Sequence, residues 1–428
     1  MAGPNKITVR MYHVGFGDCF LLTFHYHTVD RHLLIDFGTT RQSKAYMRAI
    51  ADDIKSTCNG KIDAVVVSHR HKDHLSGFKT SDDPDDPYWG DVMAELNPDL
   101  VSLTWTEDPD LEEDASGPVR GDERRSFVAS LNSMQRLAES AAAAASARKR
   151  ATELVDLSEI NISNKSALSN LLNMASAENT EYLHYGSPTA LNSVFRGVRF
   201  HVLGPPTVDQ WSKVKRQASR DADEYWHLAN YWHLLERSFD DSNGSVAPFP
   251  KRLTTKIPSS AKWLVDKMKD PTDADLLRIS RIMDRAINNT SVILLIELWG
   301  TKLLFPGDAQ IESWDYVLNG PHGERNRALL SDVSVYKVGH HASLNGTPKS
   351  LWNLFTERKD ITDGGCLVSL LSSRVQIHGK ASNGTEVPRI KLVNALKRGS
   401  QMIATPYQIS KQKKFTVVDY DDLEIEFV

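Results

Sequence analysis

The feature that most constrains this chain is a histidine-rich segment that directly follows an apolar run. Residues 62–69 read IDAVVVSH, a β-branched stretch typical of a strand that is buried on both faces. The residues that follow with metal-binding side chains are His69, His71, Asp73 and His74. Side chains two positions apart can point to the same side of an extended chain, so His69 and His71 could bind one ion. Asp73 and His74 could then bind a second ion.

Imidazole and carboxylate groups are ligands of zinc, manganese and iron, and two such ions about 3.5–4 Å apart are a common hydrolytic device. The alternative is a surface loop that happens to carry histidines. The chain has 15 histidines in 428 residues, so three of them within six positions, together with an aspartate, favour a metal site. The buried strand also supplies the rigid support that such a site requires.

Two later apolar runs also end in residues that can bind metal. LLFPGDA (303–309) places Asp308 after a strand, where its two oxygens could bridge two ions. VYKVGHHAS (335–343) places His340 and His341 after another strand. Taken singly, Asp308 could be a turn residue or a helix N-cap, and the two histidines could belong to a polar turn. Three strands that each end in a ligand weaken these alternatives together.

The rest of the chain predicts an α/β fold with strand-rich segments at both ends. Expected strands lie at 7–14, 20–27, 32–36, 62–69, 100–106, 198–206, 291–299, 302–308, 333–341, 366–373 and 415–420. Expected helices lie at 43–56, 311–318 and 389–398. We therefore expect one core over about 6–106, 181–206 and 286–428, interrupted by helix-rich insertions at about 107–180 and 207–285.

Composition excludes several classes of protein. Hydrophobic residues make up 40% and charged residues 25% of the chain, as in globular proteins and unlike disordered or coiled-coil ones. The formal net charge of −4 gives the whole chain no attraction to nucleic acid or anionic lipid. Cys19, Cys58 and Cys366 form no CxxC pair, and neither a signal-like segment nor a membrane-spanning apolar stretch is visible. We therefore expect a cytoplasmic protein with reduced thiols and no membrane contact.

The motifs resemble those of the metallo-β-lactamase fold superfamily, which has HxHxDH after a hydrophobic strand, an upstream LLID, a later GDA and a final GHH. The set VGFGDCFLL, LLIDFG, NNTSVILLIE, LLFPGDA and KVGHHAS is more specifically similar to the hydrolase domain of ComEC-type competence proteins and their soluble relatives. The resemblance covers roughly residues 6–80 and 195–400, in the family's order. It implies an αββα sandwich with two helical insertions and with metals at the rim where the strands of both sheets end.

The resemblance also assigns ligands to two divalent ions, expected to be zinc, with manganese as the alternative. The implied ligands are His69 and His71 for the first ion, Asp73 and His74 for the second, and Asp308 as the bridge between them. His341, or as a less favoured choice His340, would complete the second site. Asp36 would support the ligand loop without touching metal.

Two departures from the family pattern matter. The superfamily commonly has a third histidine on the first ion; here the candidates are His184 and His201, neither in a clear match, and related proteins can lack this ligand. Relatives often have glycine after the final two histidines, where this chain has Ala342. That replacement costs backbone freedom unless the φ angle of Ala342 is negative.

The resemblance implies a metal-dependent hydrolase, and a phosphodiesterase or nuclease is the favoured interpretation. A hydroxide held by the ions would attack the substrate, and Asp73 or a metal-bound water would protonate the leaving group. With Asp73 and Asp308, His378 is an expected catalytic residue on the substrate side, although a solvated loop residue fits it equally well. Alternatives are an esterase-type hydrolase of a lactone, thioester or β-lactam, and a non-catalytic metal-binding protein that interacts with another protein.

A nucleic-acid partner is a further hypothesis, drawn from the insertions. Basic residues occur between 120 and 150 and between 213 and 220, and aromatic residues occur between 211 and 232. Such aromatic side chains could stack on bases. However, some of them lie seven positions apart, a spacing that is equally typical of a packed helix face. A protein partner is compatible with the sequence, and no residue pattern indicates the oligomeric state.

Overall fold

The structure is a computed structural model. It describes residues 3–83, 85–108, 165–175, 177–207, 210, 287–343, 345–358, 367–375, 377, 386–405, 413–416 and 423–428. The chain divides into two compact units, of which the first comprises Met1–Asp108, Ser163–Pro206 and Asn288–Val428. The second comprises Pro109–Ile162 and Thr207–Ile287 and lies almost wholly outside the described residues, as do the basic and aromatic residues considered for nucleic-acid binding.

The first sheet of the first unit has eight strands in the order β13-β14-β1-β2-β3-β4-β5-β6. Their bounds are β1 Lys6–Met11, β2 Cys19–His25, β3 Asp30–Phe37, β4 Ala64–Val66, β5 Leu100–Thr104, β6 Thr180–Leu183, β13 Lys413–Thr416 and β14 Leu423–Phe427. β2 is antiparallel to both β1 and β3, whereas β3 to β6 run parallel. β14 is parallel to β1 and antiparallel to β13. The parallel part brings the carboxyl ends of β3 and β4 to the same edge of the sheet.

The second sheet has six strands in the order β12-β11-β10-β9-β8-β7. Their bounds are β7 Arg199–Gly204, β8 Ile293–Leu298, β9 Thr301–Phe305, β10 Val335–Lys337, β11 Val368–Leu371 and β12 Gln401–Ala404. β7, β8 and β9 pair antiparallel, and β9 to β12 run parallel. A two-residue turn joins β8 to β9, with φ angles of 51° at Trp299 and 84° at Gly300, which suits a tight hairpin. The parallel part again aligns carboxyl ends, here those of β9 and β10.

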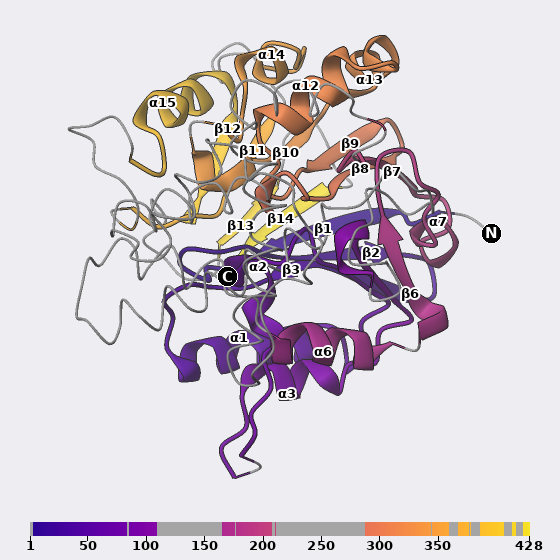
Figure 1. The fold of residues 1–428 in the computed structure, drawn as a ribbon, viewed down its shortest axis with the longest axis vertical. Coiled ribbons are helices and arrows are strands. Elements are labelled where there is room, and N and C mark those ends of the chain that lie inside the picture. Colours follow the sequence, from indigo (N-terminus) through magenta and orange to yellow (C-terminus); the bar gives the residue numbers. More distant parts are fainter. Residues whose placement is uncertain are drawn as a thin grey trace, which may run out of the picture. The chain divides into compact units, whose positions relative to one another are not determined.

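The two sheets pack against each other through their apolar faces (Figure 1). Phe20 of β2 lies 5.5 Å from Phe305 of β9, measured between ring centroids, and Phe24 of β2 lies 6.4 Å from Phe200 of β7. Aromatic contacts of this kind stabilise a core by about 0.5–1.5 kcal/mol beyond the area they bury. The sheets therefore share one core, and their strand ends can meet at a common rim.

Helices cover the outer faces of both sheets (Figure 1). Those on the first sheet are α1 Lys44–Thr57, α3 Trp89–Ala94 and α6 Lys165–Met174. Those on the second sheet are α12 Ile311–Asn319, α13 Gly323–Leu330, α14 Lys349–Trp352 and α15 Ile390–Gly399. A further short helix, α7, covers Leu191–Val194. The first unit thus has four layers, with helices outside and two sheets inside.

Helix α1 illustrates how the sequence specifies one of these elements. Ser43 is its N-cap, and the Ser43 hydroxyl accepts a hydrogen bond of 3.3 Å from the backbone N–H of Tyr46. Met47, Ile50 and Ile54 recur at helical spacing and are buried against the first sheet. Burial of each such side chain stabilises the fold by about 1.5–3 kcal/mol. The apolar stripe therefore fixes which face of α1 meets the sheet.

The α/β class expected from the sequence is confirmed, with differences at particular elements. β4 ends at Val66, although the expected strand continues to residue 69, because the Ser68 N–H donates to the Asp36 carboxylate instead of a neighbouring strand. α6 falls in the segment expected to be an insertion, yet it belongs to the first unit. The α12 N-cap is Gln310, so the N-cap interpretation of Asp308 is wrong.

Two further expectations concern thiols and membranes. Cys19 and Cys58 are buried and free, whereas Cys366 lies outside the described residues. Within the described part of the chain, the helices are all too short or too polar to cross a membrane.

Candidate metal centre

The histidine-rich segment forms the connection between β4 and the short helix α2 (Lys72–Leu75). His71 is the N-cap of α2, so Asp73 and His74 lie in a helical turn, and both are buried. The Asp18 N–H donates to the Asp73 carbonyl at 2.9 Å, which ties the loop before β2 to this turn. Gly38 is required beside it, because a Cβ there would lie 2.4 Å from the backbone of Asp73 and His74.

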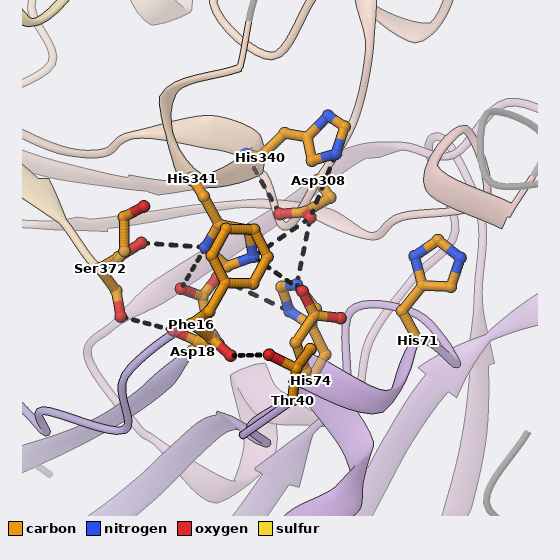
Figure 2. A network of polar contacts seen from close by, with 12 residues as sticks. Phe16, Asp18, Thr40, His71, His74, Asp308, His340, His341 and Ser372 are labelled. Carbon is orange, nitrogen blue, oxygen red and sulfur yellow. Dashed lines mark hydrogen bonds and ion pairs between the residues drawn. The ribbon is translucent and has the colours of Figure 1, made fainter. Parts of the chain in front are cut away.

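Four side chains from three distant segments converge at the edge where β4, β9 and β10 end. They are Asp73, His74, Asp308 and His341, and one ligand atom of each lies within 4.8 Å of the others. His341 Nε2 lies 3.0 Å from Asp73 Oδ2, and His74 Nε2 lies 3.2 Å from Asp308 Oδ2. Figure 2 shows His74, Asp308 and His341 turned toward one another, with His71 to one side. The convergence defines the candidate centre.

This donor set fits a divalent transition-metal ion. Two imidazole nitrogens and two carboxylate oxygens provide four donors, the number that zinc takes in tetrahedral sites. Asp73 Oδ1 is fully buried and, among the described residues, has no hydrogen-bond partner. A buried carboxylate oxygen without a partner carries a desolvation cost of several kcal/mol, which a cation would offset. We therefore treat the cluster as a candidate metal centre.

Neighbouring groups orient the two histidine rings toward the centre. His74 Nδ1 donates to Asp36 Oδ2 at 2.8 Å, and Asp36 also accepts hydrogen bonds from the N–H and the hydroxyl of Ser68. Asp36 itself has a φ of 55° and contacts His74 through Nδ1, the ring nitrogen on the far side from Nε2. His341 Nδ1 donates to the Ser372 carbonyl at 2.9 Å. In both rings Nε2 is the nitrogen left for an ion.

The contact between His341 and Asp73 also suits a cation. The Ser372 carbonyl can only accept, so Nδ1 of His341 carries a hydrogen and a neutral ring has a lone pair at Nε2. That lone pair faces a carboxylate oxygen 3.0 Å away. Two acceptors at this distance repel unless a proton or a metal ion lies between them. An ion therefore satisfies both groups at once.

The charges of the cluster shift the pKa values of its members. Burial opposes ionisation of His74 and His341, but the surrounding carboxylates, of which Asp308 has the largest effect, together outweigh it and raise the pKa of both rings. Burial would raise the pKa of Asp73 and Asp308, but His74 and His341 hold both below the ordinary range. The raised pKa values favour the protonated rings, so protons compete with an ion for His74 and His341.

The turn that presents His341 has an uncommon backbone. The segment η5 (Gly339–Ala342) has φ angles of 48°, 51° and 62° at His340, His341 and Ala342. This left-handed conformation costs roughly 1–2 kcal/mol for each residue with a side chain. Ala342 therefore has a positive φ, the conformation in which alanine is less favourable than the glycine that relatives often have at this position. The turn is held by hydrogen bonds that include His340 N–H to Asp308 Oδ1 at 3.1 Å and Arg389 N–H to the Ala342 carbonyl at 2.8 Å.

The remaining sequence-predicted histidines do not join this group of four. His69 Nε2 lies 3.0 Å from His71 Nδ1, and His69 Nδ1 lies 3.1 Å from the Ser68 hydroxyl. The pair faces each other as the spacing predicts, but in the described residues it belongs to no set of three or more converging ligands. His340 is 21% exposed, lies 4.0 Å from Asp308 Oδ2 and contacts the Ser343 hydroxyl at 2.8 Å.

The candidates for a third histidine have partners of their own. His201 Nε2 lies 3.0 Å from the carboxylate of Glu297 on β8, and His184 Nδ1 donates to the Tyr185 carbonyl at 3.1 Å. Neither belongs to a described set of converging ligands. His378 lies outside the described residues.

Sequence reasoning missed Asp18 and Lys337, which lie directly beneath the centre. Both are buried, at 0% and 2% exposure, and form an ion pair. Lys337 Nζ also lies 3.4 Å from Asp308 Oδ1 and donates to the Gly307 carbonyl at 3.0 Å. Burial alone would lower the pKa of Lys337, but the carboxylates of Asp18 and Asp308 raise it above the ordinary value. A lysine inside the apolar run VYKV was the available signal, because a charge there requires a buried partner.

Comparisons with known proteins add no identification. No family model matches the chain, and no curated protein matches it significantly.

Proposed function

We propose that this protein is a metal-dependent hydrolase of the metallo-β-lactamase type and that it cleaves phosphodiesters. The observation that carries the proposal is the buried convergence of Asp73, His74, Asp308 and His341 at the ends of three strands. The four-layer arrangement of helices and sheets supports it, since the motif resemblance implies a sandwich with its ligands at such a rim. The metal site is thus argued from the geometry of four side chains, and the type of fold from the layers of helices and sheets together with the motifs.

Residues of this chain would prepare the reaction in three ways. Asp73, His74, Asp308 and His341 would hold a divalent ion, which would supply activation of water near neutral pH and neutralisation of charge on a phosphoryl oxygen. Asp36 and the Ser372 carbonyl fix the rings of His74 and His341, which reduces the reorganisation needed when substrate binds. His340, partly exposed beside Asp308, would contact a substrate oxygen.

A polar group next to His340 supports a substrate-facing role for this edge. Gln310 is 2% exposed, and its Nε2 lies 3.4 Å from His340 Nδ1. Among the described residues, the Gln310 side-chain oxygen has no hydrogen-bond partner. A buried amide with unused capacity beside a metal centre suits recognition of a polar ligand. The preference for phosphodiesters over carboxylic esters comes from the motif resemblance.

Hydrolysis assays test this proposal directly. Purified full-length protein is incubated with bis-p-nitrophenyl phosphate, nitrocefin, a lactone and an acyl thioester, each with added zinc or manganese and with chelator. We expect metal-dependent release from the phosphodiester that chelator abolishes. Turnover of only the ester-type substrates would instead favour the esterase alternative. Single- and double-stranded DNA and RNA are then compared, because nuclease action is the finer form of the proposal.

A matched pair of variants separates the centre from the rest of the fold. Asp308→Asn removes a charge at the centre, whereas His201→Gln alters a histidine that pairs with Glu297 on β8. We expect loss of turnover in the first variant only. Metal binding without turnover of any phosphodiester or ester would contradict the proposal and favour a non-catalytic metal-binding protein.

A further inference from the structure

We infer that this centre holds a single divalent ion and that the ammonium group of Lys337 takes the place of a second cation beside Asp308. The inference rests on the metal centre of the proposed function and narrows it. It differs from the two-ion arrangement that the motif resemblance implies. Three independent observations on the described residues support it.

The first observation is how the two oxygens of Asp308 are used. Oδ2 faces the cluster, 3.2 Å from His74 Nε2 and 3.6 Å from His341 Nε2. Oδ1 faces away from it, accepting from the His340 N–H at 3.1 Å and lying 3.4 Å from Lys337 Nζ. One oxygen is therefore available to an ion, and the other already has a cation and a hydrogen-bond donor. Asp308 cannot bridge two ions through both oxygens without releasing Lys337.

The second observation concerns the other set of converging acidic and imidazole groups. Asp18, Asp36 and His74 also bring one ligand atom each within 4.8 Å. Its cation is already present, because Lys337 forms an ion pair with Asp18. The third partner of Lys337 is the Gly307 carbonyl, at 3.0 Å, so its ammonium has an acceptor for each of its three hydrogens. A fully bonded buried ammonium is not readily displaced by an ion.

The third observation is that the expected first site has too few ligands. His69 and His71 bond to each other, and in the described part of the chain they belong to no set of three ligand atoms that lie within 4.8 Å of one another. Two imidazoles alone are a poor site for zinc, which takes at least three protein ligands in its catalytic and structural sites. The group of four around Asp73 meets that requirement without them.

Metal stoichiometry of the full-length protein tests the inference. Protein stripped with chelator is dialysed against excess zinc and, separately, manganese, and bound metal is counted by elemental analysis and by calorimetric titration. We expect one tight equivalent per chain. The His69→Ala/His71→Ala variant should retain that equivalent with its Kd changed by less than about threefold, whereas His341→Ala should weaken it at least a hundredfold.

The outcomes separate this inference from the proposed function. Two equivalents, one of them lost in His69→Ala/His71→Ala, would overturn the single-ion inference and leave a metal-dependent hydrolase standing. If the protein binds no metal ion tightly, both the single-ion inference and the proposed function are overturned. One equivalent without any turnover would support the inference and contradict the proposed hydrolysis. A second equivalent that survives the double variant would also overturn the inference, because Asp18, Asp36 and His74 form the other converging set beside the centre.

The role of Lys337 has its own measurement. Lys337→Met removes a positive charge next to Asp308, so zinc should bind at least tenfold more tightly. Lys302→Met is the matched control, because Lys302 is also buried but pairs with Asp332 and the Leu329 carbonyl. Its Kd for zinc should not change. Unchanged or weaker binding in a folded Lys337→Met protein would overturn the assignment; if that variant does not fold, Lys337→Gln, which keeps a donor toward Gly307, is measured instead.

Discussion

The ion pair between Asp18 and Lys337 should dominate the stability of this edge of the fold, and a double-mutant cycle measures it. Both side chains are almost inaccessible to solvent, so removing one partner leaves a buried charge uncompensated. Such a loss costs about 3–5 kcal/mol. We expect Lys337→Met to lower the free energy of unfolding by this amount. Asp18→Asn should cost less, because Lys337 keeps Asp308 and the Gly307 carbonyl as partners.

The diagnostic result is the double variant Asp18→Asn/Lys337→Met. It removes the uncompensated charge at position 18 and leaves the Gly307 carbonyl with the His340 N–H, at 3.4 Å, as its donor, so the weakened hydrogen bonding should cost about 1–3 kcal/mol and the double variant should be more stable than Lys337→Met alone. Urea unfolding in chelator, followed by far-UV circular dichroism, gives each free energy without a contribution from metal. Lys302→Met, whose partner Asp332 is half exposed, should cost about 1 kcal/mol or less. A double variant no more stable than Lys337→Met would refute this account of the pair.

Three further predictions concern the centre itself. Asp308→Ala should abolish turnover and weaken zinc binding at least a hundredfold with an unchanged circular dichroism spectrum; wild-type turnover would show that the centre is misassigned. Because the pKa values of His74 and His341 are raised, protons should compete with the ion, and zinc affinity should fall as the pH is lowered through the pKa values of these rings, with protons released on titration; a pH-independent affinity would contradict this. Asp36→Asn should weaken zinc binding by about 10–100-fold in calorimetry without removing a ligand, and no effect would mean that ring orientation is unimportant.

The elements that the sequence predicted best are those whose pattern is local. The stripe of Met47, Ile50 and Ile54 and the cap at Ser43 define α1 without reference to any other segment. The apolar run before His69 likewise predicts a buried strand, although the strand ends earlier because Ser68 bonds to Asp36. Such endings depend on a partner that is distant in the chain, and periodicity carries no information about it.

The candidate site shows the same division. The motifs predicted that Asp73, His74, Asp308 and His341 follow the ends of strands. Only the fold shows that these four side chains converge. The partnership of Lys337 with Asp18 could not be foreseen, because nothing local links a strand of the second sheet to the loop before β2. The same holds for Asp308, whose two oxygens look equivalent in the sequence and have different partners in the structure.

The distribution of the four ligands over the fold ties metal binding to assembly of the core. Asp73 and His74 follow a strand of the first sheet, while Asp308 and His341 follow strands of the second. The complete set exists only when both sheets are docked, so an unfolded chain or a half-assembled intermediate offers at most two of the four donors. An ion at a thousandfold excess over its Kd would then add about 4 kcal/mol to the native state alone. In a cell, metal supply would therefore influence how long this protein survives proteolysis as well as whether it reacts.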